Sequence, residues 1–155
     1  MNLSSQIAKQ LRDVYSGGNY TGVNLKEALA DVDWKTAATR SYSFNTILTL
    51  VYHINYYVIA VSKVLQGEPL NASDKFSFEH PQVQSEDEWE KFLDQFWKDG
   101  ENFAVQVEQL PDSKFLEPFL DGKYGTYYRN IVGVIEHTHY HLGQIVLIKK
   151  LLSQQ

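Results

Sequence analysis

Apolar residues recur at intervals of three and four along most of the chain, which is the spacing of one face of an α-helix. Four long segments carry this pattern, at about residues 5–15, 43–65, 85–110 and 126–152. Residues 24–40 add one or two short helical turns, and no segment alternates apolar and polar residues convincingly as a strand would. The pattern predicts an all-α fold, an up-down-down-up type four-helix bundle with short extra helical turns between its first and second long helices.

The expected helix ends follow from capping residues. Ser85 is followed three residues later by Glu88, the arrangement of a capping box, so the third long helix is expected to begin there. The second long helix is expected to begin near Ser43 or Asn45. Gly100 is the weak point of the third helix, because glycine disfavours a helix interior.

Length and composition are those of a single domain spanning residues 1–155. The net charge of −5 and the absence of a basic run argue against nucleic-acid binding. No stretch is expected to approach the roughly 20 apolar residues of a membrane span, and no signal peptide is evident, so a cytoplasmic protein without membrane partners is predicted. The chain has no cysteine, so any thiol chemistry needs a thiol from a small molecule. The long connections 66–84 and 111–125 are expected to govern substrate specificity.

The last long segment contains the most informative residues for chemistry. His137 and His141 are four positions apart, so they lie one above the other on a helix and can point at a common atom. Gln144 follows on the same face and is a candidate outer partner. His139 projects to the opposite side and is expected at the surface or at a dimer contact.

A third ligand is expected from the second long helix. His53 is the only other histidine within a long helix, and facing helices of a bundle can bring it close to His137 and His141. Tyr57, one turn further on, is the aromatic residue best placed to reach the site. Three neutral imidazoles suit zinc, nickel or iron and leave a coordination position open. A structural or surface role for the histidine pair remains the alternative, although a buried pair without metal leaves two polar rings to satisfy.

Two other kinds of metal site are excluded by residue type. A zincin needs a glutamate directly after its first histidine, where this chain has Thr138. A di-iron bundle needs two Glu-x-x-His motifs, and Glu136 with His139 supplies one, on the wrong face. His80 lies beside Pro81 in a long connection and is expected to be exposed to solvent.

Three strings of sequence resemble the DinB-like superfamily. They are LVYHI at 50–54, LQGEP at 65–69 and GVIEHTHYHLGQI at 133–145. The resemblance implies a four-helix bundle, commonly a homodimer, with a divalent metal, zinc or nickel above all, on His53, His137 and His141. Better-understood relatives are metal-dependent S-transferases or isomerases that use a low-molecular-weight thiol such as bacillithiol or mycothiol.

Three functions follow as hypotheses. The first is a metal-dependent enzyme that transfers a low-molecular-weight thiol to a small-molecule substrate. The second is hydrolysis by metal-activated water, for which Asp112 or Asp121 from a loop would have to serve as the base. The third is a non-catalytic, dimeric, stress-associated module that binds metal or ligand.

Overall fold

Helices form at all four segments where apolar residues recur at helical spacing. The computed structural model describes residues 2–154, so the ends of the predicted domain 1–155 lie outside the described residues. The described part contains no strand, and the predicted all-α class is confirmed. Its long helices are α1 (Leu3–Ser16), α4 (Ile47–Leu65), α5 (Glu86–Glu108) and α6 (Tyr127–Leu152); its short ones are α2 (Leu25–Leu29), α3 (Trp34–Ala38) and the 3₁₀ turns η1 (Phe76–Phe78) and η2 (Asp112–Leu116).

Side-chain caps fix where the long helices begin. Ser85 caps α5 as predicted, its hydroxyl accepting from the amide of Glu88 at 3.3 Å. The predicted start of α4, near Ser43 or Asn45, lies one to three residues before the observed cap. Thr46 is the cap, because its hydroxyl accepts from the amide of Thr49 at 3.0 Å.

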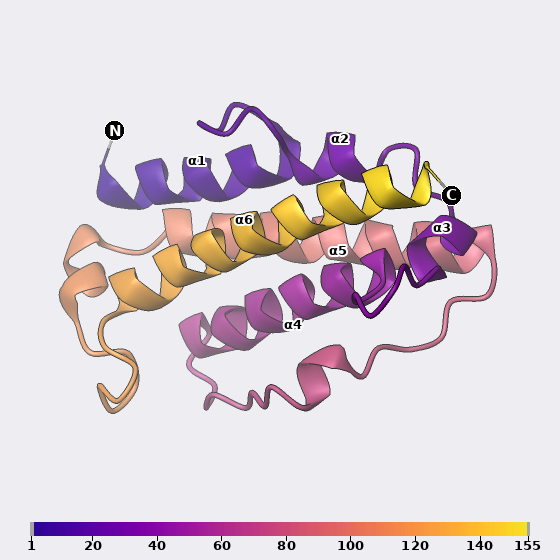
Figure 1. The fold of residues 1–155 in the computed structure, drawn as a ribbon. Coiled ribbons are helices and arrows are strands. Elements are labelled where there is room, and N and C mark those ends of the chain that lie inside the picture. Colours follow the sequence, from indigo (N-terminus) through magenta and orange to yellow (C-terminus); the bar gives the residue numbers. More distant parts are fainter. Residues whose placement is uncertain (1, 155) are drawn as a thin grey trace.

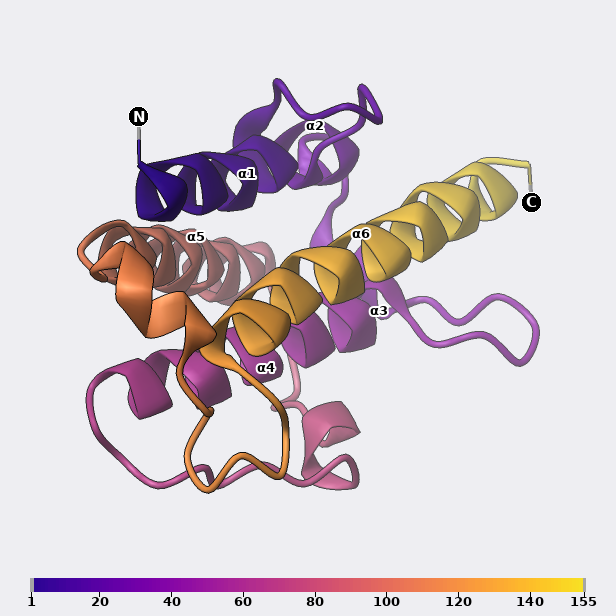
Figure 2. The same cartoon turned by 90° about the vertical axis from the view of Figure 1, so that its left-hand side faces the viewer.

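The four long helices each pack against two others (Figures 1 and 2). α1 packs on α5, α5 on α4, α4 on α6 and α6 on α1. α1 and α6 run in one direction, whereas α4 and α5 run in the opposite one (Figure 1). Because α4 and α5 are parallel, the chain between them must return along the length of α4. That return segment carries η1, which packs on α4.

The α1–α5 contact explains why α5 contains a glycine. A Cβ atom built on Gly100 would lie 2.4 Å from Cε1 of Tyr15, a distance that real Cβ contacts essentially never show. Gly100 therefore lets α1 and α5 approach closely around the Tyr15 ring. The expected weak point is a packing requirement, and α5 continues through it.

α4 has the length and apolar composition of a possible membrane span. It has 19 residues, and an 18-residue window within it has a mean hydropathy of 1.3, so the expectation that no segment approaches this limit does not hold for α4. Within the protein, 61% of that window is buried, as in the core helix of a helical protein. A membrane-spanning helix and a buried core helix can share this length and composition, so these two features do not distinguish them.

Candidate metal centre

Three histidine side chains meet between α4 and α6. Nε2 of His137 lies 3.0 Å from Nε2 of His53 and 3.0 Å from Nε2 of His141. His53 comes from the middle of α4, and the other two occupy successive turns of α6. His53 and His141 are buried, and His137 is half-buried. The structure thus brings together the three histidines singled out in the sequence, in a group able to hold a metal ion.

The hydrogen bonds of Ser77 fix the tautomer of His53. The Ser77 hydroxyl donates to the backbone carbonyl of Asp74 at 2.6 Å, which uses its only proton. It must then accept at 2.9 Å from Nδ1 of His53, which therefore carries the hydrogen. A neutral His53 consequently directs the lone pair of Nε2 at the other two rings.

Gln144 does the same for His141. Its Oε1 atom lies 2.7 Å from Nδ1 of His141 and can only accept a hydrogen bond. Nδ1 of His141 therefore carries the hydrogen and Nε2 presents a lone pair. The expected outer partner thus contacts the predicted ligand directly.

The orientation of these lone pairs fits a cation. His137 faces two acceptors with one Nε2 atom, and its Nδ1 atom is buried without a hydrogen-bond partner among the described residues. If His137 is protonated at Nε2, one hydrogen must serve two acceptors. If it is protonated at Nδ1, three lone pairs converge, which is repulsive without a positive charge. A cation would satisfy all three at once.

The distances also fit a metal ion. In a tetrahedral site with Zn–N bonds of about 2.0–2.1 Å, two ligand nitrogens lie roughly 3.3–3.4 Å apart. The two Nε2 separations of 3.0 Å at His137 are a few tenths of an ångström shorter, so small side-chain rotations bring the set to ligand geometry. The residues present therefore fit a divalent ion held by three imidazoles.

Burial keeps the three rings in the neutral form that a metal requires. Burial, followed by the proximity of His141 and His53, lowers the pKa of His137 to about 4. Burial and then His141 lower the pKa of His53. Burial lowers the pKa of His141 as well, against the opposing hydrogen bond to Gln144. All three lone pairs are thus available at neutral pH.

Aromatic rings enclose the histidines. Phe78 of η1 stacks on His53 with 4.1 Å between ring centroids. Tyr57 presents its ring edge-on to His53 at 5.2 Å and to His137 at 5.0 Å, as its position in the sequence suggested. Its hydroxyl donates to Asp74 at 3.1 Å, and burial followed by this hydrogen bond raises the pKa of Tyr57.

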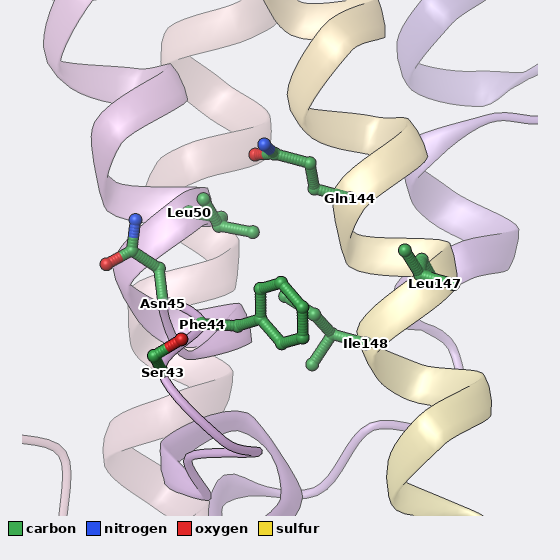
Figure 3. Close-up of a pocket in the computed structure, with 7 residues that line it drawn as sticks. All are labelled: Ser43, Phe44, Asn45, Leu50, Gln144, Leu147 and Ile148. Atoms are coloured by element: carbon green, nitrogen blue, oxygen red, sulfur yellow. The ribbon is translucent and has the colours of Figure 1, made fainter.

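Two pockets lie between α4 and α6; one is lined by His137 and the other by Gln144, the partner of His141. Toward the start of α6, a pocket of about 550 Å³ is lined by His137 and Tyr57 together with charged residues of α6. Toward its end, a smaller pocket of about 280 Å³ is lined mainly by apolar side chains. Figure 3 shows Gln144 reaching from α6 toward α4 above this second pocket, whose lining is Ser43, Phe44, Asn45, Leu50, Gln144, Leu147 and Ile148.

The remaining histidines lie elsewhere. His139 faces the α1 side of α6, where its ring lies in a pocket with Gln10 and Asp13 and its Nδ1 donates to the Ile135 carbonyl at 3.1 Å. The expectation that His80 is exposed to solvent is wrong, because His80 is half-buried. Its Nε2 lies 3.0 Å from Oγ1 of Thr49, which holds the return segment against α4.

The two loop carboxylates considered as bases are engaged at other places. Asp112 accepts hydrogen bonds from the amides of Leu3 and Ser4, both at 3.0 Å, and so caps the start of α1. These bonds lower the pKa of Asp112. Asp121 accepts from the amide of Lys123 at 3.0 Å, in the turn that precedes α6.

Sequence reasoning missed the residues that η1 and the turn before it contribute. Ser77, Asp74 and Phe78 contact His53 or Tyr57, yet none was named in advance. The available signal was the long connection 66–84 with its aromatic residues, which indicated the segment and no residue within it.

Comparisons with models of known protein families, with curated proteins and with solved structures give no match for this chain.

Proposed function

We propose that this chain is a DinB-like four-helix-bundle enzyme that joins a low-molecular-weight thiol to a small electrophilic substrate with the help of a divalent metal. The observation that carries the proposal is the convergence of three Nε2 atoms beside a pocket that reaches His137. Zinc and nickel are the proposed ions, because imidazole nitrogen suits both.

The chain's own residues prepare the site for such a reaction. Ser77 and Gln144 hold His53 and His141 in the tautomer that binds metal. Phe78 and Tyr57 cover the ring of His53 and limit the access of water from that side. A divalent ion held there would supply a Lewis acid that lowers the pKa of a thiol.

The overall reaction balances without a further co-reactant. A carbon–sulfur bond forms between the thiol and the electrophilic carbon, and the bond from that carbon to its leaving group breaks. The leaving group departs with the electron pair, and the thiol proton goes to solvent. The absence of cysteine means that no protein thiol competes for the same electrophile.

The test is a thiol-transfer assay with zinc-loaded or nickel-loaded protein. Bacillithiol, mycothiol and glutathione are each offered with a chromogenic aryl halide. We expect a rate that a chelator abolishes and that His137→Ala loses. His139→Ala is the matched control, because His139 is on the same helix and faces away from the site. Absence of a chelator-sensitive rate with every thiol would refute the proposal.

The other hypotheses receive less support from the site. Hydrolysis lacks the base expected of it, because Asp112 and Asp121 have partners elsewhere. A non-catalytic module that binds metal or ligand could use the same histidines and pocket, and the thiol-transfer assay separates it from the enzyme. The expected homodimer and the cytoplasmic location stay predictions.

A further inference from the structure

The larger pocket beside the histidines contains two charges that the proposed chemistry does not use. Arg129 and Glu136 both line it, together with His137. Neither forms an ion pair among the described residues. They are seven positions apart on α6, which places them two turns apart and almost on the same face. They are thus available to a ligand that carries both charges.

The turn before α6 holds Arg129 in place. Its Nη1 donates to the carbonyl of Tyr124 at 3.0 Å. Its stem lies against Gly125, where a Cβ atom would come within 2.9 Å of Cδ of Arg129. One of five guanidinium N–H groups is used, so the others remain free for an anion.

Asn130, the neighbour of Arg129 in the pocket, cannot bind an anion. Both polar hydrogens of the Asn130 amide are used, on the carbonyls of Tyr124 and Thr126 at 2.9 and 2.8 Å. Asn130 therefore has an acceptor oxygen left and no donor. Arg129 is the cation of this pocket.

The helix sets the distance between the charges and the histidines. Glu136 directly precedes His137, whereas Arg129 lies eight residues before it, about 12 Å along the axis at about 1.5 Å per residue. A ligand whose thiol is at the histidines therefore meets a negative charge at once and a positive charge about 12 Å away. A free amino-acid thiol is too short to reach both, whereas three extended residues span roughly 10 Å.

We propose, on the basis of the proposed function, that this pocket selects a thiol of tripeptide length with an amine near its sulfur and a carboxylate at its far end. Glu136 binds the amine and Arg129 binds the carboxylate. The smaller, mainly apolar pocket, which is lined by Gln144, is left for the electrophile (Figure 3).

The experiment measures dissociation constants by calorimetry for zinc-loaded protein with the peptide Cys-Gly-Gly, its C-terminal amide and its N-acetyl form. Wild type is expected to bind the free peptide about tenfold more tightly than either blocked form, as loss of one charge-assisted hydrogen bond implies. In Arg129→Gln, the free peptide and its C-terminal amide should bind equally, whereas the N-acetyl form should still bind more weakly. In Glu136→Gln, the free peptide and its N-acetyl form should bind equally, whereas the C-terminal amide should still bind more weakly.

Arg40→Gln is the matched control, because Arg40 is an exposed arginine outside this pocket, and it should keep both preferences. Equal affinity of wild type for all three peptides would overturn the proposal, as would equal preferences in wild type and Arg129→Gln.

A last probe separates this proposal from the proposed function. S-methyl-Cys-Gly-Gly has no thiol, so its binding depends on the two charges and not on thiol chemistry. If its affinity falls in Arg129→Gln, the charge assignment stands even where no thiol transfer is detected. If β-mercaptoethanol reacts but no peptide shows a charge preference, the proposed function stands and the pocket assignment is wrong.

Discussion

The interface of α1 with α5 and that of α4 with α6 are built from the same apolar repeat but filled differently. On the first, Tyr15 stacks on Phe96 at 5.2 Å and lies against Gly100, while Arg12 pairs with Glu101 and Glu108 at the rim. On the second, the centre is occupied by three imidazole rings whose Nε2 atoms face one another.

The difference shows which of the two interfaces carries a cost in stability. Close packing around a glycine stabilises the α1–α5 contact by dispersion and burial. Buried neutral histidines instead carry a desolvation cost, visible in their lowered pKa values. Without a ligand, α4–α6 should therefore be the weaker of the two interfaces.

Metal is expected to produce the largest change in stability. An ion at a thousand times its dissociation constant stabilises the folded state by about 4 kcal/mol, which corresponds to a rise in Tm of about 10 °C. Thermal melts with zinc and with excess chelator measure it. His139→Ala should show the full shift and His141→Ala none. A shift that survives in His141→Ala would contradict the assignment.

A substitution in the α1–α5 interface should change the free energy of unfolding by the same amount with and without metal. Gly100→Ala forces a methyl group against Tyr15 and is expected to destabilise by about 1–3 kcal/mol, despite alanine's better helix propensity. The control is Gly143→Ala, a helical glycine with nothing within 4 Å of its Cβ position, which should stabilise by about 0.5–1 kcal/mol. Urea unfolding, with and without zinc, measures both. If Gly100→Ala stabilises the protein as Gly143→Ala does, the Tyr15 ring does not lie tightly against Gly100.

Variants in the return segment test how the histidines between α4 and α6 are held in place. Ser77→Ala removes the acceptor that fixes the tautomer of His53 and should weaken zinc binding by about tenfold, since outer partners of metal ligands typically contribute that much or more. Ser73→Ala, in the same segment, should leave the affinity unchanged. Competition with a zinc indicator dye measures the two constants. Equal affinities would mean that Ser77 does not orient His53.

The smallest expected effect is the response of the metal-free protein to acid. The pKa of His137 falls from an ordinary 6.5 to about 4 on folding, so between these values the unfolded chain binds the additional proton. Stability is then complete above pH 6.5 and declines as the pH falls toward 4, by about 1 kcal/mol once partial exposure is considered. Urea unfolding in chelator at several pH values measures this. His137→Gln should flatten the curve, and an unchanged curve would contradict the assignment.

Much of this arrangement could be predicted because it depends on helical spacing. The four long helices follow from the apolar repeat, and the pairing of His137 with His141 follows from the rise of one turn. Helical spacing alone could not place His53 beside these two residues, because its position depends on the register of α4 against α6. Its identification drew on its position within a helix and on a family resemblance.

The missed features depend on tertiary structure. Ser77 reaches His53 because parallel α4 and α5 force the chain back along α4, in a segment without periodicity. Several residues before α4 can cap a helix, and only the structure shows that Thr46 does so. Nothing in the sequence around Gly100 shows that Tyr15 lies against it.

Metal content measures the central claim most directly. Protein incubated with zinc or nickel and freed of excess ion is analysed for metal per chain, alongside His53→Ala, His137→Ala and His139→Ala. We predict about one ion per chain in wild type and His139→Ala, and essentially none in the other two. Wild type without stoichiometric metal, or His53→Ala with a full complement, would contradict a metal centre formed by His53, His137 and His141.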